Sequence, residues 1–531
     1  MRRMKMAGLY FLMFWMCVGV MSCSDDDSEV EKPLAELEFV NSTFSSGELS
    51  VDAGLLNNVQ FMWANTLWEV KTEVLEGAAF ISSITPTSGG AAVQSKKQEG
   101  LKITYAANYS TKKNRMRLML LSPDGLTGDT IELVQAARVI VPLGYTIDPT
   151  RKFQTISGFG GAAIWNSESL SATEVKKIFG SDESDLGLSI VRVRIAQEQS
   201  SWVSLATILK EIVKYDVKII ASPWSPPASL KDNNNSVDGH LLPENYGAYA
   251  QHLNEFVTYM ASQGVPIYAV SIQNEPDIEV KYESCRWTPA QLLSFVQNHA
   301  RTIQNTKVVA SESFNFNKVY TDPLLNDATA VGNFDIVGGH IYGGGLSAHS
   351  LAEQKGKEVW MTEYLMNLSE KWVTAESTIW NESVEMLQSM HTAMSYNWNA
   401  YIWWYIRRYY SFLGDGDKST TAGATLKRGH AFAHFAKFVR PGYTRIHVTA
   451  DKSSELKVTA YEGDGQTIIV VVNPSVVDVS NVKWMFPVDV TSVTAYVTSL
   501  TQNRDKSEVT PSGNAFSASF PAKSVTTFVV K

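Results

Sequence analysis

Two glutamates, Glu275 and Glu363, each come just after a short apolar segment of the sequence, at 267–273 and 358–362. Aromatic side chains follow other segments of this kind, and apolar surroundings raise the pKa of a carboxyl group towards values useful for proton donation. A protonated carboxyl and an ionised carboxylate that face each other across a cleft are the groups that hydrolyse a glycosidic bond. The alternative for either glutamate is a structural ion pair, for example with Arg192.

Other side chains that could contribute chemistry lie at the ends of similar segments. Arg192 lies within 190–195, and Asn274 directly precedes Glu275. The remaining candidates are aromatic or imidazole groups: Trp224 after 217–222, His340 and Tyr342 at the end of 336–340, and Trp404 and Tyr405 at the end of 400–405. Together they form a set that one mouth of a barrel would bring around the two glutamates.

The elements that must position these residues are short apolar strands alternating with helical patterns. The predicted strands are 156–162, 190–195, 217–222, 267–273, 307–311, 336–340, 358–362 and 400–405. Between them, apolar residues in 246–260 and 292–300 recur at helical spacing. Eight such units in about 275 residues predict a (β/α)8 TIM barrel with its active site at the carboxyl ends of the strands.

The alternative fold is an open, doubly wound sheet. The segment 158–163 fits the G-x-G-x-x-A pattern of a dinucleotide-binding turn. However, the next strand, 190–195, does not end in the acidic residue that would hold a ribose. The sequence therefore favours the barrel and predicts no cofactor.

All-β regions flank the barrel, which we place at 154–430. Residues 35–140 contain short β-rich runs separated by glycine-containing turns, and they predict a small immunoglobulin-like β-sandwich. Residues 143–153 and 431–531 predict a side β-sandwich domain. The runs 67–70, 88–90 and 131–135 resemble a BACON domain, for which we expect a spacer role rather than glycan binding.

Five stretches in the barrel region carry a family resemblance: 156–162, 190–193, 221–227, 271–277 and 359–363. Their sequences and order resemble glycoside hydrolase family 30. The resemblance implies retaining hydrolysis by double displacement, with Glu275 as general acid/base and Glu363 as nucleophile. It also implies that Asn274 binds the sugar 2-hydroxyl, that Arg192 and Tyr342 bind Glu363, and that Trp224 is a sugar platform.

The stretch 403–410, which includes Trp404, Tyr405, Arg408 and Tyr410, resembles the glucuronoxylanase subgroup of that family. The resemblance implies that Arg408 and Tyr410 bind the carboxylate of a (methyl)glucuronic acid branch on xylan. A guanidinium suits this task because it can make a bidentate contact with a carboxylate. Ser369 is a weaker candidate for the same branch.

Alternatives remain for this loop and for the substrate. Arg407 and Arg408 could instead pair with Asp415 or Asp417, a reading that suits Arg407 best. The expected activity is that of a retaining endo-β-1,4-xylanase on glucuronoxylan. The other candidates are a family 30 hydrolase of β-1,6-glucan or a β-xyloside, and a non-catalytic glycan-binding surface lipoprotein.

The N-terminus has the pattern of a bacterial lipoprotein signal. A basic start and an apolar run, 7–21, lead to Ser22 and Cys23, and an acidic tether follows at 23–34. We therefore expect residues 1–22 to be removed and Cys23 to carry a lipid that anchors a monomer to the outer membrane, facing the cell surface or the periplasm. The alternative is an ordinary secretory signal with a chance cysteine.

Composition excludes several other classes. The 531 residues carry 46 Lys and Arg against 54 Asp and Glu, a formal charge of −8, which argues against a broad nucleic-acid surface. Three cysteines cannot build a disulfide framework. The histidines His340, His391, His430 and His434 show no metal-binding motif, so we expect no metal.

Overall fold

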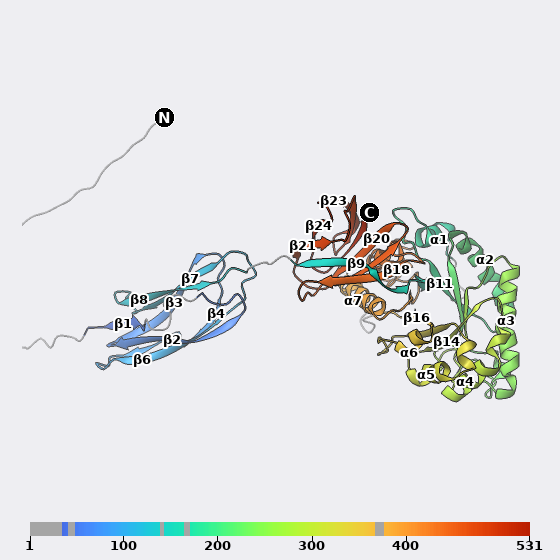
Figure 1. Cartoon of the computed structure of the whole chain (residues 1–531). Helices are drawn as coiled ribbons and strands as arrows, with labels where there is room; N and C mark the ends of the chain where they lie inside the picture. Colours follow the sequence, from blue (N-terminus) through green and yellow to red (C-terminus); the bar gives the residue numbers. More distant parts are fainter. Residues whose placement is uncertain (1–33, 41–47, 139–142, 164–169, 367–375) are drawn as a thin grey trace, which may run out of the picture. The chain divides into compact units, whose positions relative to one another are not determined.

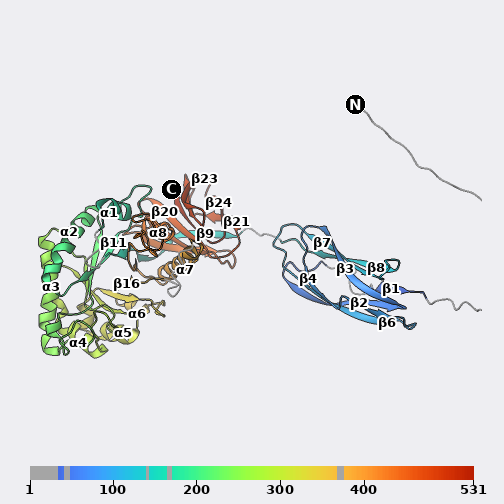
Figure 2. The same cartoon turned by 180° about the vertical axis from the view of Figure 1, so that it is seen from behind.

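The computed structural model describes residues 34–40, 48–138, 143–163, 170–366 and 376–531. The predicted lipidation site Cys23 and the branch candidate Ser369 lie outside these ranges. The chain divides into two compact units, Met1–Val141 and Pro142–Lys531 (Figures 1 and 2). Among the described residues, none of the helices has both the length and the apolar character needed to cross a bilayer.

The first unit contains two four-stranded sheets, β1-β2-β6-β4 and β5-β3-β7-β8. Alternate residues point into its core, as in β7, where every second side chain from Asn114 onward is buried. Phe61 and Trp68 meet edge to face in this core, with ring centroids 4.7 Å apart. The strands are β1 Glu36–Phe39, β2 Gly54–Ala64, β3 Thr66–Glu76, β4 Ile81–Thr85, β5 Ser88–Ala91, β6 Lys97–Tyr105, β7 Asn114–Leu121 and β8 Gly128–Gln135.

The second unit contains the predicted barrel, because β10 to β17 close into a ring of eight parallel strands. The strands are β10 Gly158–Ala162, β11 Ile190–Ile195, β12 Lys218–Pro223, β13 Ala269–Ser271, β14 Lys307–Ser313, β15 Ile336–His340, β16 Glu358–Glu363 and β17 Ala400–Trp403. The glycine-rich segment 158–163 largely forms β10 rather than a strand-to-helix turn. Gly160 is required there, since a Cβ atom would lie 2.2 Å from the Ile190 carbonyl oxygen. The barrel is confirmed, and the doubly wound sheet is wrong.

Helices connect the barrel strands, and several begin at recognisable caps. Ser171 and Glu174 form a capping box at α1, and Thr288 and Gln291 form another at α4. The predicted apolar face of 246–260 is buried along α3. The helices are α1 Ala172–Phe179, α2 Trp202–Ile212, α3 Tyr246–Ser262, α4 Pro289–Asn298, α5 Lys318–Asn326, α6 Ser350–Gln354, α7 Glu376–Ser395 and α8 Lys427–Ala436.

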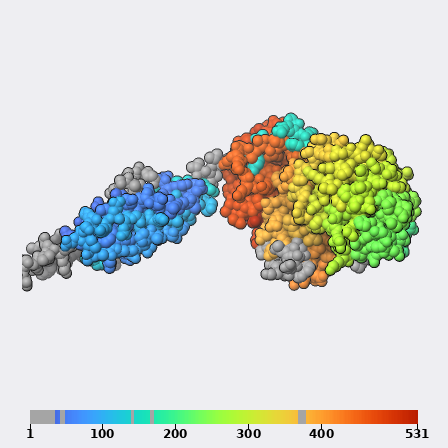
Figure 3. Space-filling view, turned by 90° about the horizontal axis from the view of Figure 1, so that it is seen from below, coloured from blue at the N-terminus to red at the C-terminus, as the bar shows by residue number. Residues whose placement is uncertain are grey.

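A nine-stranded sheet forms the side domain, in the order β23-β22-β25-β20-β19-β18-β9-β21-β24. Strand β9, which precedes the barrel, lies between β18 and β21, and Figure 3 shows its teal residues against the orange and red surface of later ones. The strands are β9 Gly144–Thr155, β18 Thr444–Ala450, β19 Lys457–Gly463, β20 Gln466–Asn473, β21 Val479–Met485, β22 Val493–Thr498, β23 Asn503–Val509, β24 Ala515–Phe520 and β25 Ser524–Val530.

Helix α8 crosses the boundary that the sequence predicts between the barrel and the side domain at 430/431. Its buried face explains why: Phe432 packs against Phe159 of the barrel, whereas His434 bonds to Thr498 and Thr527 of the side sheet. Burial lowers the pKa of His434, which is fully enclosed. One helix therefore joins both hydrophobic cores, and these contacts give His434 a structural role.

Candidate active site

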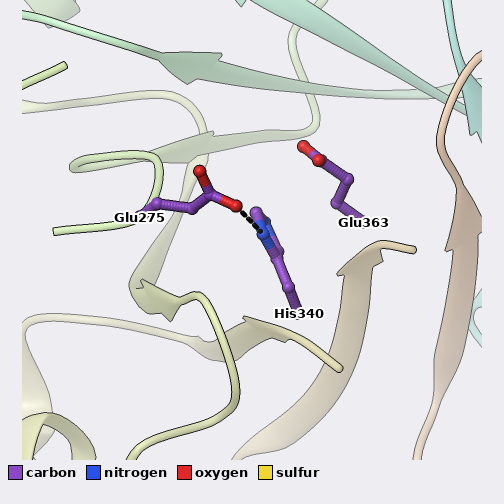
Figure 4. Close-up of side chains that lie close together, drawn as sticks. All are labelled: Glu275, His340 and Glu363. Carbon is purple, nitrogen blue, oxygen red and sulfur yellow. Dashed lines mark hydrogen bonds and ion pairs between the residues drawn. The ribbon is translucent and has the colours of Figure 1, made fainter. Parts of the chain in front are cut away.

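The two glutamates meet at the carboxyl ends of the barrel strands. Glu363 is the last residue of β16, and Glu275 follows β13 in a turn where its φ is +50°. Both side chains are buried. A carboxylate oxygen of Glu275, one of Glu363 and a ring nitrogen of His340 all lie within 4.8 Å of one another (Figure 4).

Arg192 lies beneath the glutamates and is fully buried. From the middle of β11, its Nη1 donates to Glu363 Oε2 at 2.7 Å and its Nη2 donates to Asn274 Oδ1 at 2.6 Å. The predicted contact between Arg192 and Glu363 is thus present. Because the carbonyl of the Asn274 amide is held by the guanidinium, its NH2 group is oriented to donate elsewhere.

Tyr342 makes the second predicted contact with Glu363. Its hydroxyl donates to Glu363 Oε1 at 3.0 Å. Burial and the nearby carboxylates raise the pKa of Tyr342, so the side chain is a neutral phenol that donates a proton to the bond. Both oxygens of Glu363 therefore accept a hydrogen bond from a fixed donor.

Glu275 has a different pair of partners. His340 Nδ1 lies 3.0 Å from Glu275 Oε1 (Figure 4). The Tyr282 hydroxyl donates to Glu275 Oε2 at 3.0 Å. The sequence reading missed Tyr282, and it placed His340 at this mouth without a role. Tyr282 lies in the loop after β13, where the residue spacing gives no signal of its direction.

A third carboxylate, Glu312 on β14, was also missed. It is fully buried, accepts a hydrogen bond from Arg192 Nε at 3.1 Å and another from Ser222 Oγ at 3.2 Å. A signal for it exists in the sequence: Glu312 directly follows the predicted strand 307–311, just as Glu363 follows 358–362.

Charges in the site depend strongly on one another. The pKa of Glu363 is raised by burial and by repulsion from Glu275, although His340 and Arg192 act in the opposite direction. Despite burial, the neighbouring carboxylates raise the pKa of His340 to about 9. Despite its own burial, Arg192 and His340 lower the pKa of Glu312 to about 2. The ionisation of Glu363 therefore depends on the charges of the three groups around it.

Aromatic rings form one wall of the site. The ring centroids of Trp224 and Trp404 lie 5.8 Å apart, and the Arg192 guanidinium lies 4.8 Å from the Trp224 ring centroid. Tyr405 packs against Trp404 at 4.3 Å. These contacts bring Trp224 and Trp404 beside the cation that holds Glu363; Trp224 is buried there, whereas Trp404 is partly exposed.

In the loop after β17, the neighbouring residues Arg407 and Arg408 have different partners. The expectation that Arg407 pairs with Asp415 or Asp417 is wrong, because Arg407 Nη1 lies 3.0 Å from Oε1 of Glu174, on α1. Sequence distance hid this partner, which is 233 residues away.

Arg408 takes a different course. Its guanidinium lies 4.6 Å from the Tyr405 ring centroid, and its Nη1 is 4.0 Å from Asp415 Oδ2. Tyr410 packs edge to face on Tyr409, and its carbonyl oxygen accepts a hydrogen bond from Arg428. Arg408 thus contacts the aromatic wall at Tyr405, which packs against Trp404.

The cluster of Glu275, His340 and Glu363 has the donor atoms of a metal site. Each donor already serves the network, however, because Glu363 accepts from Arg192 and Tyr342, and His340 bonds to Glu275. The buried guanidinium would also repel a cation. This arrangement suits proton transfer and nucleophilic attack better than metal binding.

Comparisons with known proteins agree with this geometry. Residues 175–313 match the glycosyl hydrolase family 30 TIM-barrel domain. The glucuronoxylanase XynC of Bacillus subtilis (strain 168) is 38% identical over 407 residues, which cover 74% of this chain and 93% of the relative.

Two solved structures are also similar. The family 30 subfamily 8 xylanase Xyn30A of Clostridium acetobutylicum superposes with a TM-score of 0.66 at 33% identity, covering 73% of this chain and 99% of the other. A family 30 endoxylanase of Clostridium papyrosolvens C71 gives a TM-score of 0.64 at 35% identity, with the same coverage.

Proposed function

Because the chain belongs to glycoside hydrolase family 30, and is therefore a glycoside hydrolase, we propose that it is a retaining endo-β-1,4-xylanase that cleaves glucuronoxylan. The observation that carries the proposal is the pair Glu275 and Glu363, with carboxylate oxygens within 4.8 Å of each other. Retaining enzymes hold their two carboxyl groups about 5–5.5 Å apart, whereas inverting enzymes need about 6.5–9.5 Å to admit a water molecule.

In this proposal Glu363 is the nucleophile. Its two oxygens accept hydrogen bonds from Arg192 and Tyr342, and such donors favour the ionised form of a carboxyl group. Glu275 is the general acid of this reaction and donates a proton to the leaving oxygen. Glu363 attacks the anomeric carbon, and the resulting glycosyl ester is hydrolysed by a water molecule that Glu275 deprotonates.

Asn274 and the aromatic wall would hold the sugar that is attacked. With its carbonyl fixed by Arg192, the Asn274 amide can donate to the 2-hydroxyl, a bond that strengthens as positive charge develops on the ring. Trp224 and Trp404 offer apolar faces on which a pyranose can stack. These contacts support a β-glycan substrate without selecting one.

The similarity to xylanases supports xylan as the substrate, and the loop after β17 supports a branched one. Arg408 can make a bidentate contact with the carboxylate of a glucuronic acid branch, with Tyr410 as a second donor. Arg407 is less suited to this task because it pairs with Glu174 at 3.0 Å, whereas the contact of Arg408 with Asp415 is longer, at 4.0 Å. Trp404 and Tyr405 connect Arg408 to the site of cleavage.

The test is product analysis on glucuronoxylan and on unbranched xylan. We expect products whose ends lie at a fixed distance from a uronic acid, and Arg408→Ala should lose about tenfold or more in kcat/KM on the branched polymer only, the worth of a charge-assisted hydrogen bond. Arg407→Ala is the matched control, because it removes a neighbouring arginine that is engaged elsewhere. Equal cleavage of both polymers by the wild-type enzyme would remove the branch from the proposal.

We also propose a lipid anchor at Cys23, on the strength of the signal pattern alone. The Cys23→Ala variant should then be released from the membrane fraction with its hydrolytic activity intact. The resemblance of residues 35–140 to a BACON domain, and the monomeric state, stay predictions.

A further inference from the structure

Glu312 is not used by the proposed reaction, although it lies at the centre of the polar network. It is fully buried, so substrate cannot touch it. Its φ of +49° lies in the left-handed region, and the β14–β15 register shifts next to it, between Ser311 and Ser313. A buried carboxylate in a strained conformation needs a compensating role or compensating contacts.

The contacts of Glu312 reach both glutamates of the proposed reaction. Its Oε1 is 3.1 Å from Nε and from Nη2 of Arg192, whose Nη1 holds Glu363. Its main-chain carbonyl accepts a hydrogen bond from the main-chain N–H of Glu275 at 3.0 Å. One residue therefore fixes the cation beneath the nucleophile and the backbone of the acid/base.

Glu312 also faces His340. The Nε2 of His340 is 3.9 Å from Glu312 Oε1, while its Nδ1 bonds to Glu275. Nε2 of His340 and Oε2 of Glu312 are buried and have no hydrogen-bond partner among the described residues. Between the carboxyl group of Glu275 and the carboxylate of Glu312, the imidazole is best stabilised when both nitrogens carry protons.

The charges balance when Glu312 is counted. Around it lie the carboxyl groups of Glu275 and Glu363 and the two basic groups, Arg192 and His340. The hydroxyls of Ser222 and Ser271 also face Glu312, and Asp277 and Tyr342 lie near His340. For the five groups Arg192, His340, Glu312, Glu275 and Glu363, the charges cancel when both basic groups are charged, Glu312 is ionised and one of the two reacting glutamates is protonated. That is the state from which a retaining reaction starts.

We propose that Glu312 is a positioning residue for the hydrolysis: its carboxylate fixes Arg192 against Glu363 and maintains His340 as the cation that orients Glu275. The inference rests on the proposed function for the roles of Glu275 and Glu363. It differs from a purely structural role because it ties Glu312 to the protonation of His340.

The experiment compares the full-length wild-type enzyme with Glu312→Gln, Glu312→Asp and Glu358→Gln. Glu358 is a suitable control, because it is a carboxylate at the start of β16, at the other end of the barrel, that bonds to Lys307 at 3.1 Å and to Trp360 at 2.7 Å. The first readout is the titration of His340 by NMR of labelled histidine, assigned by loss of its signal in His340→Asn.

We expect His340 to titrate near pH 9 in the wild type. In Glu312→Gln the midpoint should fall by at least about one pH unit, because a charge about 4 Å away is removed. Glu312→Asp should restore part of the shift, and Glu358→Gln should leave it unchanged. A neutral His340 at pH 7 would overturn the inference, and this measurement uses the wild-type enzyme alone. An unchanged titration midpoint of His340 in folded Glu312→Gln would also overturn it.

The second readout is kinetic. Glu312→Gln should lower kcat by about tenfold or more while KM changes little, because Glu312 positions groups without touching substrate. An equal loss in the Glu358→Gln control would assign the effect to stability instead. If the wild type fails to cleave glucuronoxylan, the proposed substrate is wrong, and the NMR readout still judges Glu312 by itself.

Discussion

The hydrogen bond from Tyr342 to Glu363 offers a sharp test of the proposed nucleophile, because Tyr342→Phe removes one hydroxyl and leaves the ring in place. The bond is 3.0 Å long and enclosed, since the exposed fraction of Glu363 is 7%. A hydrogen bond to a charged group contributes about 1.5–3 kcal/mol. If the bond serves the transition state, kcat/KM should fall about 10- to 150-fold.

The pH profile should change as well. Removing a donor to the ionised carboxylate raises the pKa of Glu363 further, so the acidic limb of kcat/KM should move to higher pH. The assay is initial rates of reducing-end release from glucuronoxylan across a pH series, together with a urea unfolding curve for each variant.

Tyr443→Phe is the matched control, because the Tyr443 hydroxyl also donates to a carboxylate at 3.0 Å, that of Asp464 in the side domain. It should change stability slightly and leave the pH profile alone. A Tyr342→Phe enzyme with wild-type kcat/KM and an unmoved acidic limb would refute the reasoning, and Glu363 would lose its assignment as the ionised partner.

Three further results are expected. Glu363→Ala should abolish hydrolysis of every substrate, whereas Glu275→Ala should retain measurable rates on aryl glycosides whose leaving group needs no proton, as a comparison of phenol leaving groups will show. The stabilisation from His340, whose pKa is raised to about 9, is complete below its ordinary value near 6.5 and is lost as pH rises through 9. The stabilisation from Glu312, whose pKa is lowered to about 2, is complete above its ordinary value near 4.5 and is lost as pH falls through 2, so urea midpoints should decline at both extremes. Arg428→Met should cost about 3–5 kcal/mol in urea unfolding, because it removes a fully buried guanidinium that pairs with Glu382 on α7 and bonds to the main-chain carbonyl of Tyr410. A smaller loss would mean that other contacts hold Glu382.

The barrel could be predicted from the sequence because its short, mostly apolar strands alternate with helical patterns. For β11 and β15, both bounds agree with the prediction. Strand β13 is shorter than predicted, Ala269–Ser271 rather than 267–273, because its ladders with β12 and β14 extend no further. The residues that leave the ladder form the turn that presents Glu275.

Most of the predicted site residues came from strand ends, Arg192 in the middle of β11 being an exception, and this rule explains much of what was found and missed. Glu312 obeys the same rule and could have been predicted. Tyr282 and the partner of Arg407 could not, because a loop direction and a contact across 233 residues depend on tertiary packing. Helix α8 runs across the predicted boundary at 430/431, because a helix that packs against two cores shows no break in its pattern.

The backbone at the mouth of the barrel suggests how the protein separates chemistry from stability. Glu275, Glu312 and Tyr405 all have φ values near the left-handed region's centre, +50°, +49° and +56°, a conformation that costs a non-glycine residue about 1–3 kcal/mol. The side chains of Glu275 and Glu312 bond to His340 and Arg192, and the Tyr405 ring packs against Trp404. Beneath them, the interior layer that includes Ile190 and Trp360 is apolar and fully buried. Because the indole N–H of Trp360 in that layer is satisfied by Glu358, the layer can support a mouth in which three carboxylates and a strained backbone are kept for the reaction.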